Sequence, residues 1–186
     1  PIMVPAIERP SAETSSWWFR AGAASAAEAI TANGITSNNT APKNIILFLG
    51  DGMSLSTITA AHILAGQRLN LDGESYRLSF EKFPYTALSR TYETDQQTPD
   101  SAGTMTAIMS GVKTKSGFIG TGQQAKRGDC ASAHNQELVS TLELAKAAGL
   151  AVGVVTTTTI THATPAATYG HVPDRAWEAD ANMPEQ

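Results

Sequence analysis

The feature that most constrains the fold is an uninterrupted apolar run, residues 45–49, in the stretch NIILFLGDG. Its five residues are all large, and none alternates with a polar residue as in a strand with one wet face. Such a run is typical of a strand that is covered on both sides, as in the interior of a parallel sheet. A Gly-Asp-Gly turn follows at once, so Asp51 is predicted to lie at the carboxyl end of this strand.

Two more strand candidates follow along the chain, and helix candidates separate them. The stretches YTALSRTYE and LAVGVVT, residues 85–93 and 150–156, are the predicted strands. The predicted helices cover residues 54–65, 101–110 and 136–148. The alternation of strands and helices predicts an α/β fold with a mainly parallel central sheet and helices on both faces.

The glycines and polar residues between these elements predict where the elements end. Gly66 and Gly149 are each expected to stop the helix that precedes them, because glycine readily follows the last helical turn. Residues 111–135 are rich in Gly, Lys, Ser and Thr and are expected to form a long surface loop.

The N-terminal region is predicted to be separate from this α/β segment. Residues 1–14 are expected to form an extended arm, and residues 15–34 a helix that carries a cluster of three aromatic side chains. Residues 43–186 then form the α/β segment. The chain of 186 residues is long enough for one domain or for part of a larger one.

Composition excludes several classes of protein. The net charge of −4 gives no electrostatic footprint for nucleic acid, and no apolar stretch is long enough to span a membrane. Cys130 is the single cysteine, which rules out a disulfide within the chain.

Polar residues follow each of the three predicted strands, at the edge of the sheet where ligands of open α/β sheets bind. They are Asp51, then Asp100 and Ser101, then His162 and Thr164. For Asp51 two interpretations remain open. A carboxylate at a buried strand end is costly unless it is paired, so Asp51 either caps the next helix or binds a cation.

Ser101, in the stretch TPDSAG, opens the helix predicted over residues 101–110. It can cap that helix, or it can act as a nucleophile, because a helix N-terminus attracts anions such as phosphate. A nucleophilic serine needs a general base or a metal ion. The nearest histidines in sequence, His62 and His134, are distant, so activation by a metal ion with Asp51 as one ligand is the favoured route.

The stretch THATPAATYGHVPDR carries the third group of candidates. His162 and Thr164 lie two residues apart, and Pro165 is expected at the first position of a short helix. An imidazole and a hydroxyl can face one cation, where oxygen favours magnesium and imidazole leans towards zinc. The guanidinium of Arg175 suits a phosphate, although a loop histidine and a surface arginine are the plainer interpretations. His171 is expected to be structural.

In this order and spacing, the stretches NIILFLGDGMS, TPDSAGTMTAIMSGVKTKSGFIG and THATPAATYGHVPDR resemble the alkaline phosphatase family. DSAGTMTA resembles the family's phosphoserine signature, and WWFRAG resembles its N-terminal helix. The resemblance covers most of residues 15–182 and implies that residues 43–186 are the N-terminal part of an α/β catalytic domain. It also implies hydrolysis of phosphate monoesters to an alcohol and inorganic phosphate, through a covalent phosphoserine, with two zinc ions and one magnesium ion.

The resemblance carries roles over to individual positions. It implies that Ser101 is the nucleophile, that Arg175 clamps the substrate's oxygens and that Asp100 positions this arginine. The metal ligands that it implies are Asp51, Ser101, His162 and Thr164. Aspartate is common in the family where His162 stands, so His162 ligates magnesium directly, acts through water, or makes a site that favours another metal.

The resemblance implies further that the remaining zinc ligands, several Asp and His and one Glu, belong to a C-terminal part that this chain lacks. After Asp180 the only acidic residue is Glu185. The isolated segment is therefore expected to be inactive and unstable. A homodimer and a periplasmic or secreted location follow from the family alone.

Two alternatives to a phosphomonoesterase remain. One is a related hydrolase of the wider superfamily, such as a phosphodiesterase or a sulfatase. The other is a non-catalytic module that binds an anion with the helix end at Ser101 and with Arg175, without metals. The Asp-Ser pair together with Arg175 favours the phosphomonoesterase over the first alternative, and bound zinc would discriminate against the second.

Overall fold

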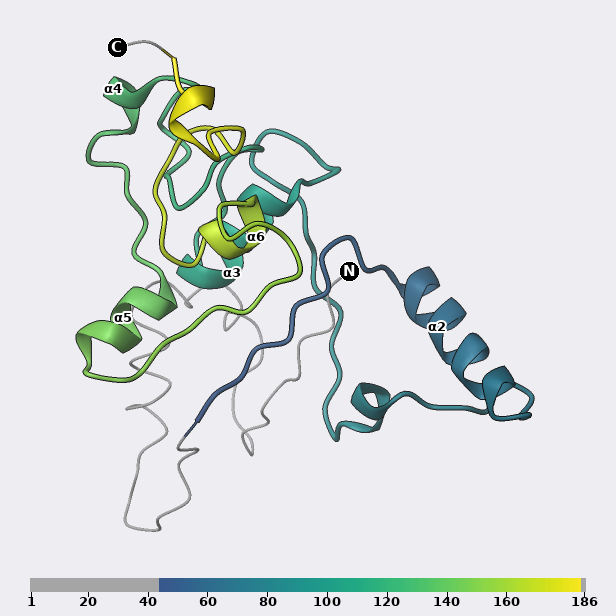
Figure 1. The fold of residues 1–186 in the computed structure, drawn as a ribbon. Helices are drawn as coiled ribbons and strands as arrows, with labels where there is room; N and C mark the ends of the chain where they lie inside the picture. The colour runs from purple at the N-terminus through teal and green to yellow at the C-terminus, as the bar shows by residue number, and fades with distance from the viewer. Residues whose placement is uncertain (1–43, 185–186) are drawn as a thin grey trace, which may run out of the picture. The chain divides into compact units, whose positions relative to one another are not determined.

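The computed structural model describes residues 44–184, which divide between two compact units. The first unit contains residues 47–91, and the second contains residues 44–46 and 92–184. Both are built from short helices joined by long irregular segments (Figure 1). The extended arm and the helix predicted over residues 1–34 lie outside the described residues.

The first unit is organised around helix α2, Leu55–Arg68. Ser54 caps the helix, because its Oγ accepts the backbone N–H of Thr57 at 3.3 Å. The Thr57 hydroxyl accepts the Ser54 N–H in return at 3.4 Å, which completes a capping box. The helix thus begins where the sequence predicted, and Ser54, not Asp51, is its cap.

The prediction that Gly66 ends this helix is wrong, because Gly66 is buried inside α2. A Cβ atom at this position would lie 2.7 Å from Gly73 Cα and 2.8 Å from Tyr76 Cβ. The missing side chain therefore lets the following loop pack closely against the helix. After that loop comes the 3₁₀ turn η2, Ser79–Lys82, which is joined to α2 by His62 Nδ1 and Glu81 Oε1 at 3.2 Å.

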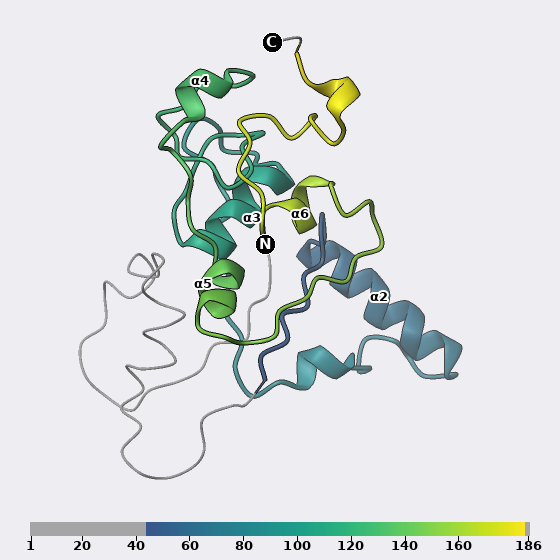
Figure 2. The same ribbon diagram turned by 60° about the vertical axis from the view of Figure 1, so that its left-hand side comes forward.

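The second unit contains the helices that carry most of the predicted site. They are α3 (Ser101–Ser110), α4 (Cys130–Ala133), α5 (Thr141–Ala147), α6 (Ala163–Ala166) and the 3₁₀ turn η3 (Asp180–Asn182). Helix α3 packs against both α5 and α6 and lies between them in both views of the ribbon (Figures 1 and 2).

Helix α3 has the bounds that the sequence predicted, and its small and apolar residues form the centre of the second unit. Ala102, Met105 and Met109 are buried, and Ala163 of α6 is fully buried with them. Gly111 ends α3 with a left-handed backbone, φ 75°, which glycine adopts without a steric penalty.

The prediction of a surface loop over residues 111–135 is wrong for residues 117–122, which are buried, whereas most of residues 123–135 are exposed. Phe118 is fully buried, and isolated antiparallel bridges join Ile119 to Val172 and Thr121 to Glu137. The polar composition is misleading because the buried hydroxyl groups bond to the backbone. Thr114 Oγ1, for example, donates to the Thr121 carbonyl at 2.6 Å, and Thr121 Oγ1 donates to the Ile119 carbonyl at 2.9 Å.

Helix α5 is shorter than predicted, because its cap lies inside the predicted span. Ser140 Oγ accepts the Glu143 N–H at 3.1 Å, and Glu143 Oε2 accepts the Ser140 N–H at 2.7 Å. This capping box fixes the start of the helix at Thr141, and the helix ends just before Gly149, as expected.

The three predicted strands are not confirmed. None of the segments 45–49, 85–93 and 150–156 forms a strand of consecutive paired residues. Their apolar side chains are exposed, with Phe48 at 85%, Leu88 at 70% and Val155 at 101% of full accessibility. Apart from an isolated bridge at Leu88, these segments lack the pairing and cover that such apolar runs need, and the parallel sheet is not seen in the described residues. No helix within residues 44–184 combines the length and apolarity needed to cross a membrane.

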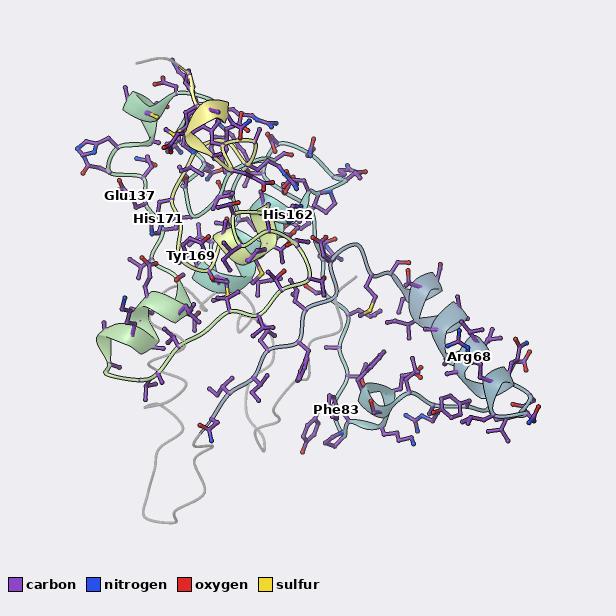
Figure 3. The ribbon with its side chains drawn as sticks, viewed as in Figure 1. Arg68, Phe83, Glu137, His162, Tyr169 and His171 are labelled. Carbon is purple, nitrogen blue, oxygen red and sulfur yellow. The ribbon has the colours of Figure 1, made fainter. Side chains whose placement is uncertain are left out.

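His171 has the structural role that its sequence position suggested. Its Nδ1 lies 2.9 Å from the Gly120 carbonyl oxygen and its Nε2 lies 3.0 Å from Glu143 Oε1, on α5. Burial of the ring opposes protonation, but these two acceptors and nearby Glu137 outweigh it and raise the pKa of His171. His171, Glu137 and Tyr169 are labelled together in Figure 3, beside α5 and α6.

Candidate active site

Asp100 is the most heavily hydrogen-bonded residue of the candidate site. It is the N-cap of α3, and its Oδ1 accepts the N–H groups of Ala102 at 2.9 Å and Gly103 at 3.0 Å. Its Oδ2 accepts the Gly117 N–H at 2.9 Å and Arg175 Nη1 at 3.1 Å. Burial would raise the pKa of Asp100, but these bonds lower it below its ordinary value, so the carboxylate stays ionised.

Arg175 reaches this carboxylate from the segment that follows α6. Its backbone N–H donates to the Gly117 carbonyl at 2.8 Å, which ties the two segments together. Its guanidinium lies between Asp100 and His162, with Nη2 at 3.4 Å from His162 Nε2. Arg175 Nη1 bonds to Asp100, and 28% of the Arg175 side chain is accessible, so part of the guanidinium can still be reached by an anion.

A second ion pair supports the backbone beside Arg175. Arg127 donates through Nε and Nη2 to the two carboxylate oxygens of Asp174, at 3.1 Å and 3.2 Å. Asp174 Oδ1 also accepts the Ala176 N–H at 2.9 Å. The residues on both sides of Arg175 are thus held, which limits the movement of its main chain.

His162 and Thr164 lie at the start of α6. His162 is the N-cap, and Pro165 occupies the third helical position, so the prediction that proline begins this helix is wrong by two residues. Thr164 is half-buried. His162 Nδ1 is buried without a hydrogen-bond partner in the described part of the chain, and the residue is labelled in Figure 3. A buried ring nitrogen of this kind suits a bound water or a cation.

Ser101 is the first residue of α3, next to the Asp100 cap, and it is half-buried. The capping residue is therefore Asp100, and Ser101 does not cap the helix. Within residues 44–184, the Ser101 hydroxyl makes no hydrogen bond. Among these residues no general base therefore bonds to the Ser101 oxygen, so its activation as a nucleophile would need a group beyond them, such as a metal ion.

Asp51 lies in an exposed turn of the first unit, whereas the other predicted site residues belong to the second. Because Ser54 caps α2, the interpretation of Asp51 as a helix cap is wrong. The interpretation as a metal ligand stays a prediction. The part of the chain that the structure describes contains no group of three or more His, Cys, Asp or Glu side chains placed to hold a metal ion.

Sequence reasoning missed two residues that build this site. Gly117, in the supposed surface loop, provides a backbone N–H to Asp100 and a carbonyl to Arg175. Glu93 is 4% accessible and accepts the Asp100 N–H at 3.1 Å. The one available signal for Glu93 was its position at the end of a predicted strand, and for Gly117 there was none.

The arrangement of these residues defines a class of chemistry. A serine hydroxyl at the start of a helix lies next to a carboxylate that holds an arginine, and a histidine lies within reach of the same arginine. Such a set suits a serine nucleophile acting on a tetrahedral oxyanion.

Comparison with known proteins identifies the family of the chain. The family described as Alkaline phosphatase matches residues 42–186, and the chain belongs to this family. The tissue-nonspecific isozyme of alkaline phosphatase from Homo sapiens is 50% identical over 149 residues, which are 80% of this chain and 28% of that protein. The alkaline phosphatase of Gadus morhua is 48% identical over 149 residues, 80% of this chain and 31% of its own.

Solved structures give the same result for the fold. Alkaline phosphatase from the Antarctic bacterium TAB5 matches 69% of this chain and 32% of its own length, with a TM-score of 0.55 and 29% identity. The Thermus thermophilus enzyme matches 69% of this chain and 24% of its own, with a TM-score of 0.54 and 32% identity. The fold is therefore alkaline phosphatase-like, and the chain spans less than a third of the length of these relatives.

Proposed function

We propose that the protein hydrolyses phosphate monoesters through a phosphoserine at Ser101. The observation that carries this proposal is the position of Ser101 as the first residue of α3, next to the Asp100–Arg175 ion pair at 3.1 Å. Membership of the alkaline phosphatase family supports the same reaction.

Each residue of the second unit has a proposed role in this reaction. Ser101 Oγ forms a bond to phosphorus as the bond from phosphorus to the alcohol oxygen breaks, and the hydroxyl proton passes through solvent to the departing alcohol. Water then breaks the phosphoserine, Ser101 regains its proton and inorganic phosphate leaves. Arg175 binds non-bridging phosphate oxygens with the guanidinium nitrogens that Asp100 does not use, and Asp100 holds it in place.

The charges of the site favour positively charged cofactors. The charge of Arg175 is largely balanced by Asp100, and two N–H groups of the first turn of α3 already bond to Asp100. A phosphate dianion therefore meets little free positive charge from these groups alone. The same shortage of free positive charge disfavours a metal-free anion-binding module.

We infer the metal ions from the family: two zinc ions and one magnesium ion. The residues that this chain offers them are Asp51, Ser101, His162 and Thr164. The buried, unpartnered Nδ1 of His162 fits a neighbouring cation or its bound water. The described residues contain no complete cluster of ligands, so the other ligands are proposed to come from further residues of the full-length protein. When bound, such ions stabilise the attacking and leaving oxygens of an in-line displacement.

The proposal extends to the setting of the enzyme. Its substrates are phosphate monoesters in general, it acts as a homodimer, and it is secreted or periplasmic, as the resemblance to the family implies. These statements apply to the full-length protein, of which this chain contributes the serine, the arginine and part of the metal ligands.

The test compares hydrolysis of a phosphate monoester by the full-length protein with that of two variants. Ser101→Ala is expected to lose hydrolysis by several orders of magnitude, because the nucleophile is gone. Ser79→Ala, at an exposed serine of η2 in the first unit, is the matched control and keeps full activity. Full activity in Ser101→Ala would refute the proposal.

A further inference from the structure

Glu93 is a buried carboxyl group that the proposed reaction does not use. Its side chain is 4% accessible, and its Oε1 accepts the backbone N–H of Asp100 at 3.1 Å. Its Oε2 accepts Gln96 Nε2 at 3.2 Å. Hydrogen bonds from two neutral donors do not replace the hydration that an ionised carboxylate loses on burial. Burial of Glu93 is therefore costly when its carboxyl group is ionised.

The carboxyl group also contacts the first turn of α3 directly. A Cβ atom at Gly103 would lie 2.4 Å from Glu93 Oε1 and 2.9 Å from the Lys115 carbonyl oxygen. Only a glycine at this position lets Glu93 reach the start of the helix. Glu93 thus fixes both the main chain of Asp100 and the turn that carries Ser101.

The charge of Glu93 depends on its neighbours. Burial is the largest influence, the Asp100 carboxylate adds to it, and together they raise the pKa of Glu93 to about 7. Lys113 acts in the opposite direction, because its ammonium attracts the ionised form. Asp100 and Lys113 are thus charged groups that act on Glu93 in opposite directions, and Arg175 bonds to the Asp100 carboxylate next to it.

We propose that Glu93 is a positioning residue of this site: it holds the Asp100 main chain in the geometry that supports Arg175, and its ionisation weakens phosphate binding. This inference rests on the proposed function. When Glu93 ionises, a second negative charge lies beside the Asp100–Arg175 pair. That charge binds Arg175 more firmly to the carboxylates and repels the phosphate dianion.

The experiment measures the dissociation constant of inorganic phosphate for the full-length protein by calorimetry between pH 6 and pH 8.5. The variant Glu93→Gln keeps an oxygen that accepts the Asp100 N–H but cannot ionise. Wild type and variant are expected to bind phosphate equally at pH 6. At pH 8 the variant is expected to bind roughly five times more tightly, and the ratio of the two constants removes the titration of phosphate itself.

Glu74→Gln is the matched control, because Glu74 is an exposed carboxylate of the first unit. Its ratio to wild type is expected to stay flat with pH. A flat ratio for Glu93→Gln in a protein that binds phosphate would overturn this inference and leave the proposed function intact. A wild-type protein that neither binds phosphate nor hydrolyses monoesters would overturn both.

A second variant decides the question if Glu93→Gln does not fold. Gln96 is exposed, and Gln96→Ala removes the amide that stabilises the ionised Glu93 without touching the buried carboxyl group. The pH at which phosphate affinity changes is expected to move upward in this variant. An unchanged profile would count against the role of Glu93.

Discussion

Replacement of Asp100 by Asn tests whether its four hydrogen bonds hold the candidate site together. Each carboxylate oxygen accepts two donors, one pair from the first turn of α3 and the other from Gly117 and Arg175. An asparagine has one oxygen, so it can serve one pair while its NH₂ group faces the other pair, donor against donor. The substitution changes almost no volume, which isolates the hydrogen bonding.

The cost follows from these contacts. If the asparagine oxygen keeps the helix cap, the buried Gly117 N–H is left unpaired, at about 1–2 kcal/mol. The half-buried ion pair with Arg175 is lost as well, at up to about 1 kcal/mol. If the amide turns the other way, loss of the cap costs about 1 kcal/mol, and the buried N–H groups of the first turn add to it. In either orientation the local cost is about 1–3 kcal/mol.

Hydrogen exchange of the full-length protein, followed in peptides covering residues 99–118, measures this cost locally. Asp100→Asn is expected to speed exchange there by roughly 5- to 150-fold. Asp129→Asn is the control, because Asp129 caps α4 by accepting the Ser132 N–H at 3.2 Å, a bond that asparagine can also accept. Exchange in Asp100→Asn within threefold of wild type would refute the reasoning.

Three further predictions concern residues around this centre. Gly103→Ala is expected to destabilise the protein by about 1–3 kcal/mol in thermal unfolding, because the new methyl group collides with Glu93; an unchanged Tm would contradict the contact. Because folding raises the pKa of His171, its protonation adds to the free energy of unfolding fully below pH ~6.5, and this stabilisation is lost as the pH rises through the folded-state pKa. His171→Gln should therefore make the free energy of unfolding depend less on pH between pH 6 and 8.5. A pH dependence as steep as that of wild type would disprove this prediction. Arg127→Ala breaks the ion pair with Asp174. Because the Arg127 side chain is 53% accessible, the loss in thermal unfolding should be less than about 1 kcal/mol, and a larger loss would contradict this prediction.

The sequence predicted helix α3 and the start of α2 correctly, because both depend on local signals. A polar cap precedes a run of small or apolar residues in each case, and these signals need no distant partner. The end of α2 was not predicted, because Gly66 serves the packing of Gly73 and Tyr76, which lie beyond the helix. Packing between segments is not visible in a local pattern.

The predictions of the three strands and of an exposed loop over residues 117–122 were wrong for a related reason. An apolar run such as residues 45–49 predicts a strand only if neighbouring strands pair with it, and the described residues provide none. Thr114 and Thr121, by contrast, look like loop residues, but their hydroxyl groups are satisfied by backbone carbonyls and are fully buried.

Within the candidate site, motif spacing led to Asp100, Ser101, His162 and Arg175, and the structure brings Asp100, His162 and Arg175 into contact. Gly117 and Glu93 could not be found in this way. Gly117 acts through its backbone, which carries no side-chain signature, and Glu93 acts through its burial, which the sequence does not reveal.

The measurement that tests the central claim most directly is trapping of the covalent intermediate. The full-length protein, supplied with the proposed zinc and magnesium ions, is incubated with radiolabelled inorganic phosphate at mildly acidic pH, quenched in acid and digested for mass spectrometry. The account predicts one phosphorylated peptide, with the phosphate on Ser101, and no label in Ser101→Ala. A label on another residue, or monoester hydrolysis that persists without Ser101, would contradict it.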